Sequence, residues 1–226
     1  GGYIIAGTTG SYGTHLDAWL VKITADGDLT WHKTFDCQGE HDQGLYVQQT
    51  RDGGYILAGE SRAYGAATYD AFLVKTDSEG KQIWKKIYDK GEDERANHVV
   101  QARNGDYVVA GFIGSRSSHY DAYIFKVDSS GVVKWEKAIG GDDNEYANSL
   151  VITGDGGIVF AGSSGSQAWM VKLREGWRSD LQPGDILMSL DGKPVDSAGM
   201  VTIDGENVNL NEIIKRKFDG VVRIRN

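Results

Sequence analysis

The sequence predicts a mainly β protein built from repeated antiparallel sheets, and three observations lead to this prediction. Short apolar phrases recur in a fixed order about every fifty residues. Each phrase is rich in β-branched and aromatic residues and is bounded by Gly, Asp, Asn or Ser, which is typical of strands joined by tight turns. The composition agrees with a folded, turn-rich chain, because 40% of the 226 residues are hydrophobic and 31 are glycines, but only 2 are prolines.

The most regular phrase is an apolar strand that ends in Ala-Gly. It begins at Tyr3, Tyr55, Tyr107 and Ile158, so that its copies are separated by 52, 52 and 51 residues. The phrase is apolar at every position instead of alternating between apolar and polar residues. This pattern predicts a strand that is covered on both faces, such as a middle strand of a packed sheet.

Three further phrases accompany the first one. An Asp-Ala-apolar phrase that ends in Lys begins at Asp17, Asp70, Asp121 and, with Gln in place of Asp, at Gln167. A phrase that ends in tryptophan follows a turn, at Trp31, Trp84 and Trp135. The fourth phrase (GLYVQQT, NHVVQA and NSLVIT) precedes the glycine turn that leads into the Ala-Gly strand. Four strands in a unit of about fifty residues predict a β-propeller blade.

This order of phrases resembles the bacterial β-propeller repeat family, over residues 1–173. The resemblance implies a first blade without its innermost strand, complete blades over about 44–89 and 96–139, and a fourth blade of three strands that ends at Leu173. Such an incomplete ring leaves strand edges unpaired. Because the chain also opens in the middle of a repeat without a Met, we expect a fragment, completed by further blades of the parent chain or by a second copy.

The stretch LQPGDILMSLDGKPV, residues 181–195, departs from the repeat. It resembles the PDZ domains of bacterial extracytoplasmic proteases, and NLNEIIKRKF over 209–218 predicts an amphipathic helix. The resemblance implies a small, truncated α+β module over residues 174–226 that captures a peptide as an added strand. The candidate peptide-binding residues on its strand and helix are Ile186, Met188, Ile213, Ile214 and Lys217. The alternative is that the apolar members of this set form the core of the module.

The distribution of charge limits the possible partners. The net charge is −8, and the first 173 residues contain 23 acidic and 16 basic side chains, against 9 and 8 in the rest. An acidic surface repels phosphate backbones, so no nucleic acid partner is expected. No apolar run reaches the roughly 18 residues of a membrane span. The single cysteine, Cys37, excludes an internal disulfide and is either a thiol activated by His41 or a plain loop residue.

No combination of residues predicts catalysis, a metal or a cofactor. The five histidines do not form a zinc motif, and the acidic clusters TADGD and GGDDNE lack the spacing of a calcium loop. The series Asp17, Asp70 and Asp121 is either a ring of cation ligands or a set of turn-forming residues. The three repeated tryptophans are either a platform for carbohydrate or packing between sheets.

These observations predict a non-catalytic, extracytoplasmic binding or scaffold protein with a propeller surface and a PDZ-like tail that docks a peptide or protein. One alternative is the regulatory or substrate-recognition part of a larger secreted PDZ-containing serine protease. A further alternative is a propeller that binds carbohydrate.

Overall fold

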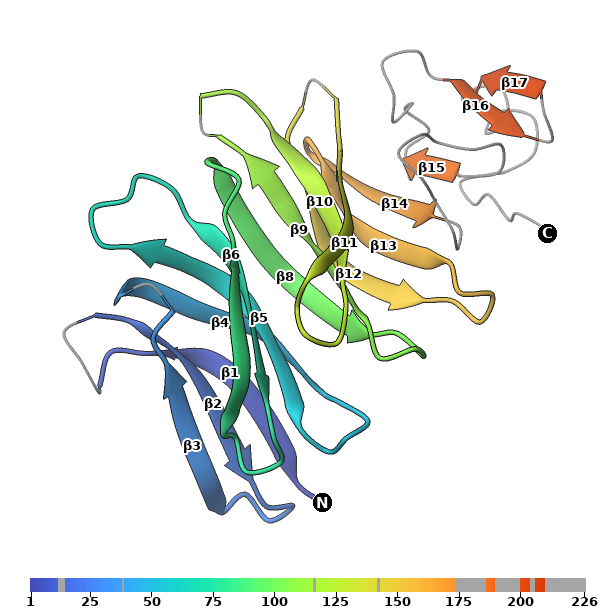
Figure 1. Ribbon diagram of the computed structural model, residues 1–226. Helices are drawn as coiled ribbons and strands as arrows, with labels where there is room; N and C mark the ends of the chain where they lie inside the picture. The colour runs from blue at the N-terminus through green and yellow to red at the C-terminus, as the bar shows by residue number, and fades with distance from the viewer. Residues whose placement is uncertain are drawn as a thin grey trace.

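The computed structural model describes residues 1–11, 15–37, 39–115, 117–141 and 143–173, and three short strands beyond them. This part of the chain contains no helix, which agrees with the predicted, mainly β fold class. Four antiparallel sheets follow one another along the chain, and Figure 1 shows them side by side from the blue N-terminal sheet to the orange one.

Each sheet is a meander, in which strands adjacent in the sheet are also adjacent in the chain. Sheet 1 contains β1 (Tyr3–Thr9), β2 (Asp17–Ile23) and β3 (Leu29–Phe35). Sheet 2 contains β4 (Gly39–Gln49), β5 (Tyr55–Ala63), β6 (Asp70–Thr76) and β7 (Gln82–Tyr88). Sheet 3 contains β8 (Asp93–Gln101), β9 (Tyr107–Gly114), β10 (Tyr120–Val127) and β11 (Val133–Ile139). Sheet 4 contains β12 (Glu145–Ile152), β13 (Ile158–Ser164), β14 (Gln167–Leu173) and β15 (Ile186–Ser189).

The repeated phrases occupy the same place in each sheet. In sheets 2, 3 and 4 the Ala-Gly phrase forms the second strand and the Asp-Ala phrase the third, so both lie in the middle of a four-stranded sheet, whereas in the three-stranded sheet 1 they form the first and second strands. All seven residues of β6 and the first seven of β5 are buried. The prediction that uniformly apolar strands are covered on both faces is therefore confirmed in sheet 2.

The glycine of the Ala-Gly phrase allows the first strand of a sheet to approach closely. A Cβ atom at Gly59, Gly111 or Gly162 would overlap the carbonyl oxygen of Gln43, Arg95 or Tyr146, respectively. Just beyond these contacts, the register of the first strand shifts by one residue in all three sheets. The glycine therefore accommodates a bulge on its neighbouring strand, which explains why it recurs.

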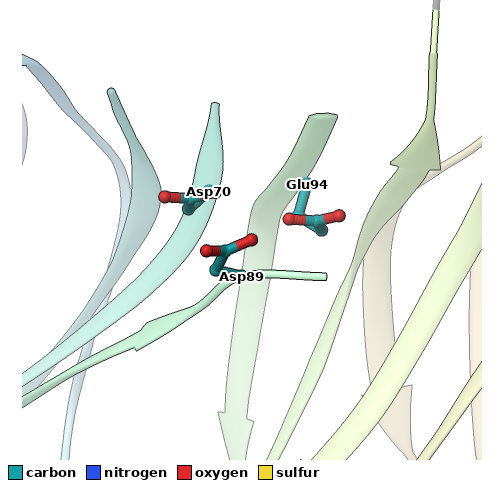
Figure 2. Close-up of side chains that lie close together, drawn as sticks. All are labelled: Asp70, Asp89 and Glu94. Atoms are coloured by element: carbon teal, nitrogen blue, oxygen red, sulfur yellow. The ribbon is translucent and has the colours of Figure 1, made fainter. Parts of the chain in front are cut away.

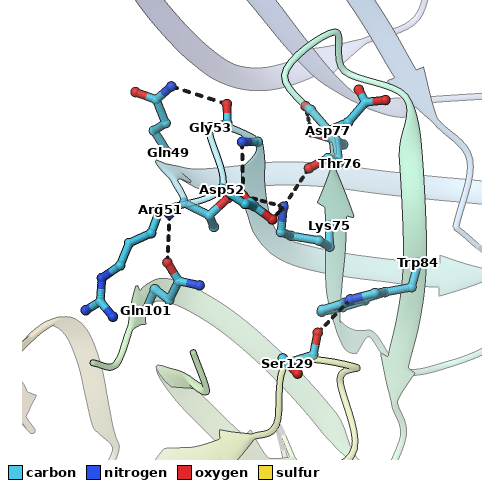
Figure 3. Close-up of polar contacts among 12 residues, drawn as sticks. Gln49, Arg51, Asp52, Gly53, Lys75, Thr76, Asp77, Trp84, Gln101 and Ser129 are labelled. Atoms are coloured by element: carbon cyan, nitrogen blue, oxygen red, sulfur yellow. Dashed lines mark hydrogen bonds and ion pairs between the residues drawn. The ribbon is translucent and has the colours of Figure 1, made fainter. Parts of the chain in front are cut away.

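The lysine that ends the Asp-Ala phrase anchors the glycine turn (Figure 3). The Lys75 ammonium lies 2.9 Å from Asp52, which also accepts hydrogen bonds from the Thr50 hydroxyl and the Gly54 amide. Burial acts to raise the pKa of Asp52, but the hydrogen bonds from Thr50 and Lys75 outweigh it and lower this pKa to about 2. The equivalent pairs are Lys126 with Asp106, at 3.2 Å, and Lys172 with Asp155, at 2.9 Å.

Apolar side chains between consecutive sheets form three cores, at what we call the first, second and third junctions. At the second junction, Trp84 of β7 meets Tyr107 of β9 edge to face, with ring centroids 6.0 Å apart. Its indole N–H donates to the Ser129 carbonyl at 3.0 Å, as Figure 3 shows. Trp31 meets Tyr55 in the same way at the first junction, with centroids 5.7 Å apart. The predicted packing role is thus confirmed for these two tryptophans.

The outermost sheets differ from the middle ones. In sheet 1, β1 pairs only with β2, as expected for a sheet without its innermost strand, and Tyr3 is 60% exposed whereas Tyr55 is 3% exposed. In sheet 4, β15 pairs with β14 as a fourth strand, with Ile186 opposite Lys172. The sequence had predicted a fourth sheet of three strands that ends at Leu173. This prediction missed β15, which carries none of the repeated phrases. Backbone hydrogen bonds can recruit a strand that carries no repeated phrase.

Beyond sheet 4, β16 (Met200–Ile203) and β17 (Glu206–Asn209) form an antiparallel hairpin. Asn209, the first residue of the predicted helix over 209–218, ends β17, and residues 210–218 lie outside the described residues. Within the described part of the chain, no helix has the length and apolar character needed to cross a membrane.

Candidate functional site

Carboxylate side chains lie close together where the third strand of one sheet and the first strand of the next sheet begin. At the second junction, Asp70, Asp89 and Glu94 place carboxylate oxygens within 4.8 Å of one another (Figure 2). Asp70 begins β6, Asp89 follows β7, and Glu94 belongs to β8. Three carboxylates so close together repel one another unless they share protons or a cation.

Glu94, one of the two buried members of this cluster, holds the loop that connects two sheets. Both oxygens of Glu94 accept backbone amides, from Lys90 at 3.2 Å and from Glu92 at 3.3 Å. Burial raises the pKa of Glu94 to about 7; the two amides oppose this shift, while Asp70 and Asp89 add to it. A carboxyl group with this pKa is partly protonated at neutral pH, which reduces the repulsion in the cluster.

The same arrangement recurs at the other two junctions. Asp42 accepts the Cys37 amide at 2.7 Å, and Glu145 accepts the Gly141 amide at 3.0 Å. Burial also raises the pKa of both carboxyl groups. Because this arrangement occurs at all three junctions, we infer that its role is to hold the loop that connects two sheets. The repeated phrases of the sequence pointed to Asp17, Asp70 and Asp121, whereas these three loop-binding carboxylates belong to no repeated phrase and could not be predicted from it.

A concave site adjoins the acid cluster at the second junction. This site, the Arg95 pocket, has a volume of about 250 Å³ and is lined by Glu60, Tyr69, Asp93, Glu94, Arg95, Phe112 and Tyr120. Glu60 comes from sheet 2 and Arg95 from sheet 3, and the Arg95 Nε atom lies 3.2 Å from the Glu60 carboxylate. Burial raises the pKa of Glu60, while the positive charge of Arg95 acts in the opposite direction.

The remaining wall of the pocket is aromatic and tied to Asp93. One oxygen of Asp93 accepts the Tyr69 amide at 2.9 Å, and the other accepts the Tyr120 hydroxyl at 3.1 Å. The Arg95 guanidinium lies 6.0 Å from the centroid of the Phe112 ring, which in turn meets Tyr120 edge to face at 5.0 Å. Sheet 2 and sheet 3 therefore fix both the charged and the aromatic groups of the pocket.

A larger cleft of about 550 Å³ lies at the third junction, toward the glycine turns. We call it the Trp135 cleft. Its walls include Trp135 of β11, the apolar residues Val108, Ile158 and Leu173, and the turn residues 153–156. Ile158 stands where Tyr55 and Tyr107 stand in the preceding sheets, so a smaller side chain faces the tryptophan here.

The residues proposed for peptide binding are only partly described. Ile186 and Met188 lie on β15, opposite Lys172 and Met170 of β14. Ile213, Ile214 and Lys217 lie outside the described residues. The structure therefore does not bring this set together at one site.

Cys37 is not an activated thiol. Burial, and then the charge of Asp42, raises the pKa of the Cys37 thiol far above its usual range. The thiol sulfur lies 4.0 Å from the Phe35 carbonyl, and the Cys37 amide is the group that Asp42 accepts. A thiolate is the nucleophilic form of cysteine, so this environment favours the loop role over the reactive one.

No protein-family model and no curated protein matches the sequence. Among solved structures, the chain is similar to a hypothetical protein from Leishmania major, with 15% identity and a TM-score of 0.47 over 85% of this chain and 68% of that one. It is also similar to a xylan beta-1,4-xylosidase from Bacillus halodurans C-125, with 15% identity and a TM-score of 0.47. This second match covers 84% of this chain but only 41% of the xylosidase.

Proposed function

We propose that this protein is a non-catalytic binding protein whose sheets are the blades of a β-propeller. Two features support the propeller. All the sheets are meanders, and the first strands β4, β8 and β12 lie against one another in succession, as the inner strands of neighbouring blades do. In this arrangement the Arg95 pocket lies between two blades, at the same edge as the loops that connect them.

The observation that carries the binding function is that the carboxylates around the Arg95 pocket are already engaged. Glu60 is paired with Arg95, Asp93 is bound by the Tyr69 amide and the Tyr120 hydroxyl, and Glu94 is bound by two backbone amides. Polar groups that are held in place in this way suit the orientation of a bound ligand.

A hydrolysis panel tests this proposal. The purified 226-residue chain is incubated with chromogenic glycosides, esters and peptides, in parallel with Glu60→Gln and Glu94→Gln variants. We expect equal, background rates for all three proteins, because neither carboxyl group takes part in a reaction. Turnover that survives repurification and is lost in either variant would show that the protein is an enzyme.

We also propose that the open edge of β1 receives a further strand, from additional blades of the parent chain or from a second copy. Tyr3 and Ile5 are exposed on β1, and a Cβ atom at Gly7 would meet no backbone atom within 4 Å, whereas one at Gly59 of β5 would overlap the β4 backbone. An Ile5→Lys variant is expected to reduce self-association measured by light scattering, if the added strand comes from a second copy. Leu29→Lys, at an exposed position on β3, is the matched control; equal effects of the two variants would contradict a specific edge.

The PDZ-like resemblance supports a second docking site, in the module over 174–226, and an extracytoplasmic location. We propose that this module takes an extended peptide beside the strand that contains Ile186 and Met188. A library of fluorescent peptides with free carboxyl ends tests the proposal by polarisation. We expect Ile213→Asp and Lys217→Ala to weaken binding, whereas a peptide that binds both variants as well as the wild type would remove the proposed groove.

A further inference from the structure

The Arg95 pocket departs from the pattern that the other junctions share. Glu60 and Phe112 are equivalent residues, because each lies on the second strand of its sheet and pairs with the first strand, opposite Gln43 and Arg95, respectively. Across the second junction, Glu60 meets the charged Arg95 at 3.2 Å. Across the third junction, Phe112 meets the aromatic Tyr146, with centroids 5.2 Å apart.

The difference indicates that the charged pair does not serve the connection between sheets. An aromatic pair closes the equivalent place at the third junction without any ionised group. A partly buried ion pair is costly to desolvate and contributes little to stability on balance. The pair Glu60 and Arg95 therefore points to recognition of a ligand at the pocket between them.

The hydrogen-bonding groups of the pocket define the chemistry of that ligand. Arg95 only donates hydrogen bonds, and its Nε atom, which lies 3.2 Å from the Glu60 carboxylate, is buried and makes no hydrogen bond within the described part of the chain. The carboxylate oxygens of Glu60 and Asp93 accept hydrogen bonds. A ligand amine would place donors against Arg95, and a ligand carboxylate would place acceptors against Glu60 and Asp93. Hydroxyl groups suit both sides, because each one donates and accepts.

The size and the walls of the pocket restrict the ligand further. Its volume of about 250 Å³ is smaller than the roughly 300–1,000 Å³ of sites that hold drug-sized molecules. The rings of Tyr69, Phe112 and Tyr120 line one wall. Aromatic faces of this kind pack against the C–H groups of a ligand that carries its hydroxyls at the rim.

We propose that the Arg95 pocket binds one ring of a neutral, hydroxyl-rich ligand, a sugar. The guanidinium of Arg95 donates to one or two hydroxyl oxygens, the Glu60 and Asp93 carboxylates accept hydroxyl protons, and the Phe112 ring packs against the carbon skeleton. This inference rests on the proposed binding function and names its ligand.

The test is a titration of the full chain with neutral monosaccharides, D-glucose, D-xylose, D-mannose and N-acetyl-D-glucosamine, by saturation-transfer NMR and calorimetry. Methylammonium chloride and sodium acetate serve as donor-only and acceptor-only probes. We expect at least one sugar to bind, and neither probe to compete with it. Binding of methylammonium or acetate in place of every sugar, or no sugar binding at all, would overturn the proposal.

Two variants locate the binding. Arg95→Lys keeps the charge but loses the planar fork, and should weaken the sugar affinity about tenfold, as expected when one charged hydrogen bond is lost. Arg51→Lys, the same exchange at an exposed glycine turn, is the matched control and should leave the affinity unchanged. Phe112→Leu keeps an apolar side chain without the ring, and thermal unfolding shows that each variant is folded.

A sugar that binds the folded Arg95→Lys and Phe112→Leu variants as well as the wild type would place the site elsewhere and refute the proposal. This failure is distinct from failure of the proposed function. If the hydrolysis panel shows no turnover and no sugar binds, then the assignment of the ligand is wrong although the protein is not shown to be an enzyme. Turnover that depends on Glu60 or Glu94 would instead overturn the binding function itself.

Discussion

The second and third junctions place an equivalent tryptophan in different surroundings. At the second junction, the Trp84 ring meets Tyr107, its N–H is bonded to the Ser129 carbonyl, and Gly131 of the next hairpin lies against the ring. At the third junction, Ile158 replaces the tyrosine, and Trp135 lines a cleft of about 550 Å³. Both tryptophans are partly buried, but the same phrase accompanies a contact with a tyrosine ring in one place and a cleft in the other.

The tryptophan alone is therefore not sufficient to fill the space between two sheets. Closure at the second junction also needs a large aromatic residue at the start of β9 and a glycine in the turn between β10 and β11. A Cβ atom at Gly131 would lie 3.1 Å from the Trp84 ring, and the Tyr88 hydroxyl donates to the Gly131 carbonyl at 3.0 Å. Three elements that are distant in sequence thus meet around one indole.

The largest expected effect is a difference in stability between two tryptophan substitutions. Trp84→Ala should lower the free energy of unfolding by about 3 kcal/mol, the low end of the usual loss for a large aromatic side chain in a core, because Trp84 is only partly buried. Trp135→Ala should cost about half as much, because one side of this ring faces the cleft. Urea denaturation measures both values. Equal costs would show that the two junctions are equally closed.

The second prediction concerns pH and compares the acid clusters of these junctions. The pKa of Glu94 is raised to about 7 in the folded protein, above its ordinary value of 4.5. Protonated Glu94 therefore stabilises the fold fully below pH 4.5, and this contribution, about 3 kcal/mol, is lost as the pH rises from 4.5 through 7. Thermal unfolding over this pH range should show the decline.

Removing one charge from the acid cluster at the second junction tests whether repulsion between carboxylates causes this decline. Gly140 of the third junction stands where Asp89 stands in the second, so Asp89→Asn makes the two clusters alike in charge. We expect Asp89→Asn to raise the melting temperature above pH 7 and to have little effect below pH 4.5. Asp26→Asn, in an exposed turn, is the control. A uniform gain at all pH values would argue against repulsion as the cause.

The third prediction probes the contact between the turn and the tryptophan. Gly131 and Gly27 both have positive φ, +83° and +94°, so alanine is strained at either position. A Cβ atom at Gly27 has open space, whereas one at Gly131 would lie 2.8 Å from Lys86 Cγ. We expect Gly27→Ala to cost about 1 kcal/mol and Gly131→Ala about 1 kcal/mol more. Costs that do not differ in denaturant titrations would mean that the turn does not press on Trp84.

The fourth prediction, with a smaller change in stability, concerns giving the third junction the tyrosine that the second junction has. Ile158→Tyr places the missing ring beside Trp135 and should stabilise the protein by up to about 1 kcal/mol, because apolar surface is removed from water. Ile158→Val, which enlarges the cleft, should cost about 1 kcal/mol. A loss of stability with tyrosine would show that the cleft has no room for the ring.

Much of the fold could be predicted from the sequence because each strand carries its own local pattern. The uniformly apolar Ala-Gly phrase at Tyr55 predicted a middle strand, and the phrase that ends at Trp84 predicted a strand after a turn. Both predictions are confirmed by the order of β5, β6 and β7 in sheet 2. The position of β15 could not be predicted in this way, since its pairing with β14 depends on backbone atoms and not on a repeated side chain.

The candidate site was less predictable. Glu60 and Arg95 are 35 residues apart and belong to no repeated phrase, so no local pattern joins them. The one signal available in the sequence was a departure from the repeat. Glu60 is charged where Thr8, Phe112 and Ser163 occupy the equivalent position in the other sheets. A residue that departs from a repeat is free to serve a purpose other than the fold.

Local patterns in the sequence define the strands, their order within a sheet and the residues of the turns, because hydrogen bonding between neighbouring strands and turn conformation depend on nearby residues. Which junction contains a cleft, and which carboxylates meet, depends on contacts between sheets that no local pattern encodes. These outcomes depend on the packing of side chains from two sheets, and a difference as small as Ile for Tyr at residue 158 changes the volume that remains between them.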